Sequence, residues 1–508
     1  MSQHKPNILI LMADQMTPTA LAAYGNQVSK TPAIDALARD GVVFDSAYCN
    51  SPLCAPSRYV FMSGKLPSTI GAYDNAADLP SDVLTFGHYL RNADYRTILS
   101  GKMHFCGADQ VHGFEERLTT DIYPADYGWT PDWERPQDRP TWYHNMSSVT
   151  DAGTCIRTNQ LDFDDEVVFA ARQKLFDLAR DTDKRPFCMV VSMTHPHDPY
   201  AIPEQYWNLY KDGDIDMPRV TMAPEQLDPH SRRLRHVSNM DAEPVTEQQI
   251  RNARHAYYGS ISYVDEQFGS IRRTLEQTGL ADDTIIIVTS DHGDMLGERG
   301  LWYKMSYFEP ATRVPLIVHA PKRFQAHRVA ESVSLVDILP TLVDFAFDGT
   351  SPTFPERIDG RSLLPHLLGH GGHDEVIGEY LAEGAIAPLL MIRRGRHKFI
   401  HSPVDPDQLY DLVSDPDELN NLANDLASAE LLQSLRAEVA TRWDLGELRA
   451  EVVASQRRRR FQYSAQVQGA RQPWDFQPMK DASQLYMRNH IDLDTLEGRA
   501  RFPRVSQA

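Results

Sequence analysis

Apolar runs with almost no polar interruption alternate with amphipathic stretches along the first 375 residues. The runs at 8–13, 187–193 and 284–289 are typical of strands in a sheet that is covered on both faces. Apolar residues at helical spacing predict long helices at 164–181 and 247–279. Strands and helices that alternate in this way predict an α/β fold, in which helices sandwich a large, mostly parallel sheet.

Weaker patterns lie between these elements. Apolar residues at helical spacing predict shorter helices at 82–92 and 334–346. Short apolar segments predict further strands at 42–44, 96–99 and 314–319. All of these elements extend the same alternating arrangement.

After about residue 375 the pattern changes. Short runs at 389–393, 398–401 and 408–412 predict antiparallel strands, and 428–445 is expected to form a helix. These elements predict a smaller α+β subdomain with an antiparallel sheet. We therefore expect a large N-terminal domain at 1–375, a C-terminal subdomain at 376–456 and a tail at 457–508.

The expected tail lacks strong periodicity. Its aromatic residues gather at 474–478 and 486–490, and this content favours docking on a neighbouring subunit over disorder. The basic run 457–460 is interpreted as a solvated segment and not as a nucleic-acid site.

Composition limits the partners and the compartment. Hydrophobic residues make up 42% and charged residues 24% of the 508, which is ordinary for a soluble globular protein. The net charge of −19 argues against a nucleic-acid partner, because an acidic surface repels phosphates. Five cysteines are few and odd in number, which suits a reducing compartment, and no apolar run is long enough to span a membrane. We expect a cytoplasmic protein without a membrane partner.

The segment 50–65 carries the most distinctive chemistry. Pro56 is expected at the first position of a short helix, which Gly64 can end. Cys54 would then lie just before the helix N-terminus, where free N–H groups favour negative charge. Arg58 would point back towards Cys54 from one turn later. A lone cysteine in such a place is more often structural than reactive, so the wider string decides.

Two predicted strands end in groups that can bind a cation. The first strand delivers Asp14 and Gln15, and the strand at 284–289 is followed by Asp291 and His292. Ligands bind at this edge of an open α/β sheet, and oxygen-rich donors select a hard cation. A single Asp at a strand end is more often a helix cap, and the residues alone leave that alternative open.

Basic side chains follow other predicted strands. Lys102 and His104 are two residues apart, so in an extended stretch they face the same way. His197 lies in a rigid tip between prolines, and Lys304 follows in a later loop. Taken alone, a Lys-x-His pair is commonplace and is more simply interpreted as a surface feature.

The string Cys54-Ala55-Pro56-Ser57-Arg58 resembles the signature of the type I sulfatases, Cys-x-Pro-Ser-Arg followed by a Gly. The resemblance extends along nearly the whole chain, and the tail resembles the one found in choline sulfatases. Its further motifs are Gly-Lys-x-His at 101–104, Pro-His-x-Pro at 196–199 and the segment 409–416. The resemblance implies an alkaline-phosphatase-like sulfatase fold. It also implies that a formylglycine-generating enzyme oxidises Cys54 to formylglycine (3-oxoalanine), an aldehyde.

The same resemblance implies a metal site. A divalent cation, usually Ca²⁺ in this family with Mg²⁺ or Mn²⁺ as alternatives, would be held by Asp14, Gln15, Cys54, Asp291 and His292. Many sulfatases have Asp where Gln15 stands, and often Asn where His292 stands. An amide in place of a carboxylate lowers the negative charge of the site, which leaves the identity of the metal open.

The family mechanism assigns the remaining roles. Asp291 would take a proton from the hydrated aldehyde at position 54, whose oxygen attacks sulfur. His197 would protonate the departing alcohol, and His104 would remove the second diol proton. The covalent sulfo-enzyme hemiacetal would then collapse by C–O cleavage and release sulfate. The groups that would steady the charged species are Lys102 and Lys304 on the sulfuryl oxygens and Arg58 on the diol.

The implied substrate is choline sulfate, hydrolysed to choline and sulfate. Aromatic faces with a carboxylate nearby hold a quaternary ammonium group well. Tyr123, Trp129 and Trp133 are candidates in the aromatic-rich stretch 107–162, and we hypothesise that Trp129 and Asp198 line the choline pocket. The alternative is that these aromatics only pack the long loops. The resemblance also implies a homo-oligomer, a tetramer, assembled through the tail.

Two other functions fit parts of the sequence. A phosphonate monoester hydrolase or phosphodiesterase of the same superfamily shares Cys-x-Pro-Ser-Arg, the metal site and Asp-Gln in the first motif. A metal-stabilised binding protein for quaternary amines, in which Cys54 stays a thiol, is the alternative from a different class.

Overall fold

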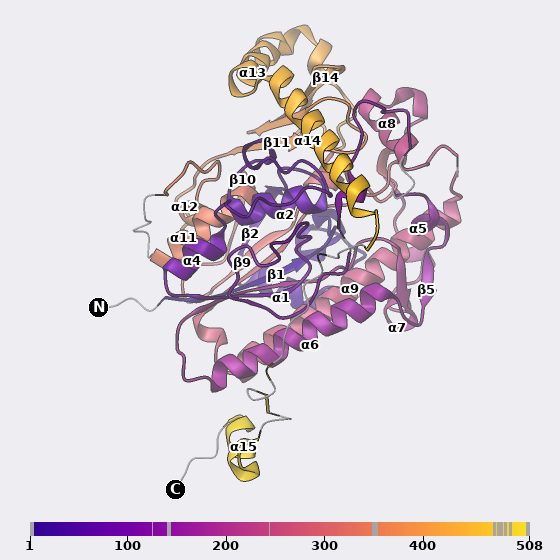
Figure 1. The fold of residues 1–508 in the computed structure, drawn as a ribbon. Coiled ribbons are helices and arrows are strands. Elements are labelled where there is room, and N and C mark those ends of the chain that lie inside the picture. Colours follow the sequence, from indigo (N-terminus) through magenta and orange to yellow (C-terminus); the bar gives the residue numbers. More distant parts are fainter. Residues whose placement is uncertain are drawn as a thin grey trace.

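The predicted large sheet is present in the computed structural model (Figure 1), which describes residues 5–123, 125–139, 144–242, 244–347, 354–470, 474, 481, 485–486 and 490–503. Eight strands run in the order β10-β2-β9-β8-β1-β6-β3-β4. Strand β9 is antiparallel to both of its neighbours, and the other pairs are parallel. The strands are β1 (Asn7–Ala13), β2 (Val42–Tyr48), β3 (Arg96–Gly101), β4 (Glu116–Arg117), β6 (Phe187–Ser192), β8 (Thr284–Ser290), β9 (Leu316–His319) and β10 (His327–Ser334).

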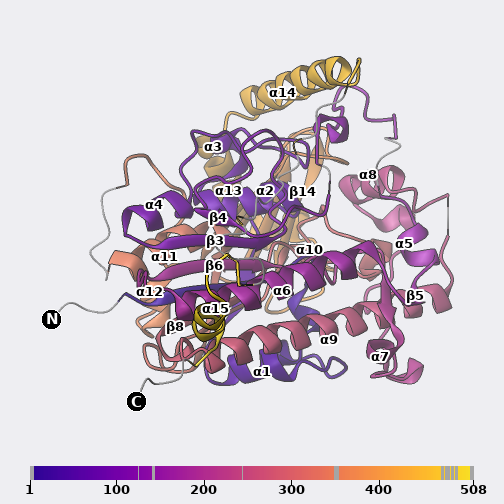
Figure 2. The ribbon, with the colours of Figure 1, turned by 60° about the horizontal axis from the view of Figure 1, so that its bottom comes forward.

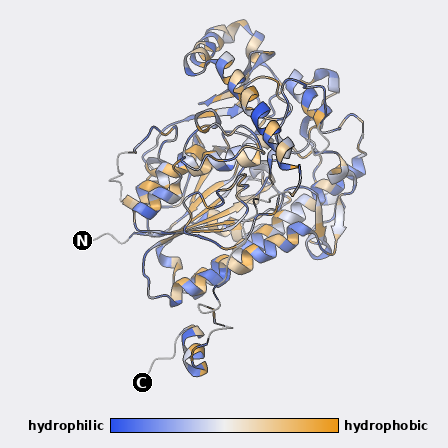
Figure 3. Ribbon diagram, viewed as in Figure 1, coloured by the Kyte–Doolittle hydropathy of each residue, from blue (hydrophilic) through white to orange (hydrophobic). Residues whose placement is uncertain are grey.

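Alternate residues of β1 separate the two apolar layers of the domain. Leu9 and Leu11 pack with the helices of one face, and Ile8 and Ile10 pack with those of the other. The first face is covered by α1 (Pro32–Arg39), α6 (Asn159–Arg180) and α9 (Glu247–Gln277), and the second by α2 (Cys54–Ser63), α4 (Phe86–Asn92) and α11 (Ile338–Phe347). Figure 3 shows the hydrophobic strands between these layers. Because both faces are covered, the strands are apolar along their length.

A second sheet forms the C-terminal subdomain. Its strands are β11 (Glu375–Tyr380), β12 (Leu389–Arg394), β13 (His397–Ser402) and β14 (Asp405–Asp411), and every pairing is antiparallel. Helix α13 (Ala429–Arg442) packs against it through Leu432, Leu435 and Val439. The predicted antiparallel subdomain is therefore confirmed.

Shorter elements lie between these strands and helices. They are β5 (Gly153–Cys155), β7 (Ala201–Pro203), α3 (Pro67–Ile70), α5 (Ser147–Thr150), α7 (Glu204–Trp207), α8 (Pro229–Val237), α10 (Glu309–Thr312) and α12 (Leu364–Leu367). Two of them, β5 and β7, form a separate two-stranded parallel sheet. No helix in the described ranges is long and apolar enough to cross a membrane.

Several predicted boundaries were wrong. Helix α4 begins at Phe86 rather than 82, after Thr85, whose backbone N–H donates to the His88 ring. The helix expected at 334–346 begins only at Ile338, because Ser334 ends the unpredicted strand β10. The helix expected at 428–445 ends at Arg442.

The start of the expected tail is helical. Helix α14 (Leu445–Gln466) runs through the boundary expected between 456 and 457, and α15 (Leu493–Ala500) lies near the C-terminus (Figure 2). The buried positions of α14 include Gln456 and Arg459, and this polar content hid its periodicity. Of the aromatic tail segments, 475–478 and 487–489 lie outside the described residues.

Candidate active site

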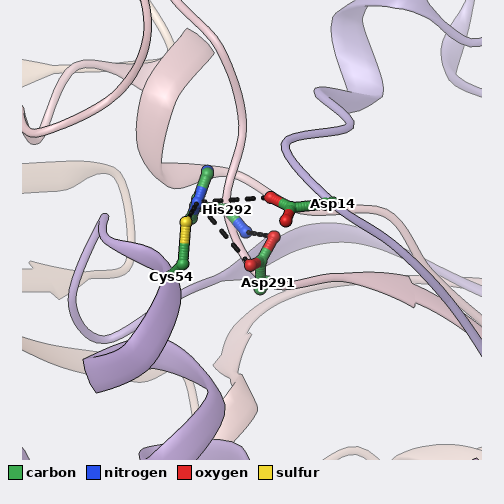
Figure 4. Close-up of side chains that lie close together, drawn as sticks. All are labelled: Asp14, Cys54, Asp291 and His292. Carbon is green, nitrogen blue, oxygen red and sulfur yellow. Dashed lines mark hydrogen bonds and ion pairs between the residues drawn. The ribbon is translucent and has the colours of Figure 1, made fainter. Parts of the chain in front are cut away.

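Neighbouring parallel strands bring the predicted metal ligands together. Strands β1 and β8 pair in register up to Ala13 and Ser290, so the next residues, Asp14 and Asp291, emerge at one edge of the sheet. Ligand atoms of Asp14, Cys54, Asp291 and His292 all lie within 4.8 Å of one another, and all four residues are buried (Figure 4).

Cys54 is the first residue of α2, not the residue before it. Pro56 takes the third helical position, where its missing N–H costs nothing because the first N–H groups of a helix have no acceptor within the helix. The prediction that Pro56 starts the helix was therefore wrong. Gly64 ends α2 as expected, with φ of 66°.

Arg58 joins the two carboxylates behind Cys54. Its Nε donates to Asp291 Oδ2 at 2.9 Å, and its Nη2 lies 3.4 Å from Asp14 Oδ2. The same guanidinium donates to the Lys102 carbonyl at 2.6 Å and to Ser192 Oγ at 2.9 Å. Because every partner comes from a strand end or its following loop, Arg58 fixes the carboxylates relative to α2.

The surroundings of Cys54 favour an anion. Burial alone raises the pKa of its thiol, but the charges of Lys102, Lys304 and His292 outweigh burial and hold the pKa well below its ordinary value. His292 Nε2 lies 3.3 Å from Cys54 Sγ. The site is therefore built to stabilise negative charge on an atom attached at position 54.

Lys102 and His104 line the same cavity as Cys54. Lys102 Nζ donates to Asp14 Oδ2, and both side chains are fully buried. His104 Nε2 lies 3.2 Å from the Asn75 carbonyl, and Asn75 Oδ1 accepts from the Ala55 N–H at 2.9 Å. No motif pointed to this role of Asn75, which connects His104 to the start of α2.

His197 and Lys304 form a second polar pair in the site. Lys304 Nζ lies 2.8 Å from His197 Nε2, while His197 Nδ1 donates to the Asp198 carbonyl at 2.6 Å. Burial alone raises the pKa of the Asp198 carboxyl, but His197, His144 and Lys304 hold that pKa well below its usual range. Asp198 is therefore an ionised carboxylate, and its Oδ2 accepts from Ser148 Oγ at 2.9 Å.

Gln15 borders the metal-ligand cluster. Its backbone N–H donates to Asp291 Oδ1 at 3.0 Å. Its Oε1 accepts from Lys304 Nζ at 2.6 Å, and its Nε2 donates to Asp294 Oδ2 at 2.7 Å. The amide thus faces Lys304, and the predicted role of Gln15 as a ligand stays a prediction.

A cavity of about 290 Å³ opens over these groups. It contains both residues that were hypothesised for the substrate, Trp129 and Asp198. Trp133 is instead buried in the core, where its Nε1 donates to the Ala382 carbonyl at 3.0 Å. The other predicted residues that line the cavity are Cys54, Lys102, His104, Tyr123, His197 and Lys304.

The cavity also contains Glu383, which the sequence analysis missed. Its side chain is only 4% exposed, and its Oε2 has no hydrogen-bond partner among the described residues. Burial, followed by the nearby charge of Asp74, raises the pKa of Glu383 to about 8. Glu383 lies in the loop after β11 without any recognisable motif, so no local signal could have found it.

The cluster around Asp14 fits a divalent cation. Asp14 Oδ1 is buried and accepts no hydrogen bond within the described part of the chain. The cluster combines two carboxylates with an imidazole, and its ligand atoms are close enough to share one ion. An ion would satisfy the carboxylate oxygen that the protein itself leaves without a partner.

Comparison with known proteins agrees with this geometry. Residues 6–348 match the family described as Sulfatase. This chain belongs to the sulfatase family. Residues 297–444 of this sulfatase also match the C-terminal region of N-sulphoglucosamine sulphohydrolase, and residues 450–502 match the choline sulfatase C-terminal region.

Individual relatives cover most of this sulfatase. It is 46% identical to a choline-sulfatase of Rhizobium meliloti over 515 aligned residues, covering 99% of this chain and 100% of the relative. It is 30% identical to arylsulfatase K of Gallus gallus, covering 85% and 81% of the two chains. The crystal structure of a phosphonate monoester hydrolase of Agrobacterium radiobacter shares the fold, with a TM-score of 0.68, 24% identity and coverage of 88% and 96%.

Proposed function

We propose that this sulfatase hydrolyses choline sulfate to choline and sulfate. The observation that carries the proposal is the cavity, which contains both the cationic region at Cys54 and the buried carboxyl group of Glu383, one oxygen of which has no hydrogen-bond partner among the described residues. A zwitterionic substrate with a sulfate at one end and a quaternary ammonium at the other matches that distribution of charge. The 46% identity to a choline-sulfatase supports the same substrate.

The sulfate end would lie between two buried lysines. Lys102 and Lys304 both line the cavity beside Cys54, and neither exposes more than 1% of its surface. Ammonium groups held in a site that excludes water stabilise charge on the sulfuryl oxygens far more than they would in water. Both lysines are already placed by the protein, so little reorganisation is needed during the reaction.

The ammonium end would contact aromatic and acidic groups. Lys102 Nζ lies 4.5 Å from the centre of the Tyr123 ring, so a cation already uses one aromatic face of the cavity. Trp129 lies beside it, with 6.5 Å between the centres of the two rings. We assign the trimethylammonium group to Trp129, because indole is the best aromatic partner for a cation, and to Glu383, which supplies the counter-charge when it is ionised. Asp198, which also lines the cavity, stays a predicted member of this pocket.

Two groups that the family implies would act with these residues. Formylglycine at position 54 would supply, as its hydrate, the oxygen that attacks sulfur. A divalent cation would be held by Asp14, Asp291, His292 and the group at position 54, with Gln15 as a further predicted ligand. It would supply positive charge at the sulfuryl group. We expect Ca²⁺, with Mg²⁺ or Mn²⁺ as alternatives that elemental analysis of the purified protein distinguishes.

The remaining steps depend on side chains that the structure describes. Asp291, oriented by Arg58, would accept the proton of the attacking hydroxyl. His197 would protonate the choline oxygen as it leaves, with its Nδ1 tied to the Asp198 carbonyl so that Nε2 faces the reacting group. His104 would then take the proton of the second hydroxyl, which allows C–O cleavage and release of sulfate.

We also propose the cellular setting that the sequence suggested. All five cysteines are free, which supports function in a reducing, cytoplasmic compartment. The match to the Sulfatase family supports maturation of Cys54 by a formylglycine-generating enzyme. The match of residues 450–502 to the choline sulfatase C-terminal region supports a tail-mediated homo-oligomer, with a tetramer expected.

The test compares three substrates on one preparation. These are choline sulfate, its uncharged isostere 3,3-dimethylbutyl sulfate and a phenyl phosphonate monoester. We expect the highest kcat/KM for choline sulfate, and a peptide mass across Cys54 should show formylglycine. The variant Cys54→Ser should lose the activity. Faster turnover of the phosphonate than of choline sulfate would favour the hydrolase of the same superfamily, and binding of choline without turnover would favour the binding protein.

A further inference from the structure

Helix α14 lies across the loops that form the substrate cavity. In Figure 1 it runs from the C-terminal subdomain across the catalytic domain, and Figure 2 shows it above α2. Its buried Arg459 is 3% exposed. The prediction of a solvated basic run is therefore wrong for Arg459.

Arg459 makes a bidentate ion pair with a second buried residue. Its two terminal nitrogens donate to the Asp74 carboxylate oxygens at 2.6 and 2.7 Å, and Asp74 is fully buried. The residue after Asp74 is Asn75, which lines the cavity and contacts Ala55. One side chain of α14 thus fixes the loop that borders the catalytic helix.

The same face of α14 holds the loop that carries Trp129. Arg459 Nη1 lies 3.3 Å from Thr130 Oγ1, and Gln456 Oε1 accepts a hydrogen bond from the backbone N–H of Trp133 at 3.0 Å. A Cβ atom at Gly128 would lie 2.8 Å from the Tyr463 ring, so only glycine allows this close approach. We call Gln456, Arg459 and Tyr463 the anchoring face of α14.

The anchoring face also reaches the loop of Glu383. Trp133, which Gln456 holds, donates through Nε1 to the carbonyl of Ala382, the residue before Glu383. Neighbouring arginines contact the loop that carries Trp129 and Trp133: Arg457 Nε lies 2.7 Å from Glu134 Oε2, and Arg460 pairs with Asp132. Segments near 75, 129 and 383 are distant in sequence, yet all three are fastened to one helix.

We propose that Arg459 is a positioning residue for the part of the cavity that binds the ammonium group, and that α14 thereby sets substrate specificity. This inference rests on the proposed function, because it assigns Trp129 and Glu383 to the ammonium group. Arg459 touches no reacting atom. It acts by fixing Asp74 and Thr130, so that Trp129 and Glu383 face the same bound cation.

Arginine suits this position for a physical reason. Its planar guanidinium supplies two parallel hydrogen bonds to one carboxylate and a further donor to Thr130, whereas lysine offers a point charge. Losing the arginine would leave Asp74 buried and unpaired, which is strongly destabilising. The test therefore needs a variant that removes both charges.

The experiment measures a discrimination ratio, which is kcat/KM for choline sulfate divided by kcat/KM for 3,3-dimethylbutyl sulfate. Unfolded protein, incomplete maturation and damage to the nucleophile lower kcat/KM equally for the two substrates, so these effects cancel in the ratio. The ratio is measured well above the pKa of about 8 for Glu383, so that this carboxyl group is ionised with or without the nearby charge of Asp74. There we expect the ratio to fall about fivefold or more in Arg459→Met and in Asp74→Asn/Arg459→Met, as one weakened cation–π contact would cause. The double variant should recover thermal stability over the single one, while its ratio stays low.

Arg458→Met is the matched control, because Arg458 is exposed on the same helix and carries the same charge. Its ratio should stay within about twofold of the parent. A parental ratio in the folded Asp74→Asn/Arg459→Met variant, or an equal fall in Arg458→Met, would overturn the inference. If neither variant with methionine at position 459 folds, Arg459→Lys gives the same comparison, because lysine retains the charge but cannot form the two parallel hydrogen bonds to Asp74. A ratio near one in the parent would instead overturn the proposed function.

Discussion

The preference of the enzyme for a cationic substrate should depend on pH, because the carboxyl group of Glu383 titrates. This carboxyl group is buried in the cavity, and burial raises its pKa to about 8. Below that pH the group is neutral and cannot attract trimethylammonium, and above it the group is an anion. The quaternary ammonium of choline sulfate does not titrate, so a change in preference reports on the protein alone.

The expected magnitude follows from the fraction of Glu383 that is ionised. With a pKa of about 8, that fraction is about one tenth at pH 7 and about nine tenths at pH 9. Because kcat/KM reflects the free enzyme, the discrimination ratio between choline sulfate and 3,3-dimethylbutyl sulfate should rise about ninefold over this interval. Groups that act in the chemical steps affect both substrates alike and cancel in the ratio.

Glu383→Gln is the control for this assignment. The amide keeps the size of the side chain but cannot ionise, so its ratio should be low and independent of pH. Two unit charges about 5 Å apart attract by about 3 kcal/mol at an effective dielectric constant near 20. At pH 9 the variant should therefore lose up to about 100-fold in the ratio. The discrimination ratio of the parent should be followed from about pH 6.5 to about pH 9.5, which spans the titration of Glu383. A constant ratio in the parent, or the same rise in Glu383→Gln, would refute the reasoning.

The raised pKa of Glu383 also makes the stability of the folded protein depend on pH, and this stability falls as pH rises. Between the ordinary value of 4.5 and about 8, the folded protein retains a proton on Glu383 that the unfolded chain has lost. The free energy of unfolding should therefore fall as pH rises through this window, and the fall should be smaller in Glu383→Gln. Urea unfolding at several pH values measures this difference, and identical slopes for the two proteins would contradict it.

Three further predictions address the leaving group, the aromatic contact and the tail. His197→Ala should lower kcat for choline sulfate by about 10²–10⁴-fold. It should lower kcat for 4-nitrophenyl sulfate far less, because nitrophenolate leaves without a proton. Equal losses of kcat for the two substrates would argue against His197 as the acid. Trp129→Ala should raise KM for choline sulfate by roughly 3–30-fold and that for the aryl sulfate much less, whereas equal effects on both would contradict the assignment. Removal of the residues after Gln466, where α14 ends, should break the oligomer, and an unchanged mass by light scattering would count against the tail.

The sequence predicted those parts of the molecule whose signal is local. Apolar runs gave β1 and β8, and the register of parallel strands then required Asp14 and Asp291 to meet. Glu383 could not be found in this way, because it joins the cavity through contacts such as that between Trp133 and Ala382, which are 249 positions apart. Arg459 was misread for a related reason: its partner Asp74 lies 385 positions away, and a buried arginine in a basic run looks solvated until that partner is known.

The two ends of the cavity are held by different parts of the chain. Arg58 fixes the catalytic carboxylates through contacts to Asp291 and Asp14, which belong to the central sheet. The end that we propose for the ammonium group consists of loop residues, and α14 holds those loops. Changes in α14 should therefore alter which substrate is preferred, and they reach the groups around position 54 through Asn75, which contacts Ala55 and His104. Specificity in this sulfatase should accordingly be more sensitive than turnover to substitutions on the anchoring face, because specificity depends on three aligned loops and turnover on the Asn75 loop alone.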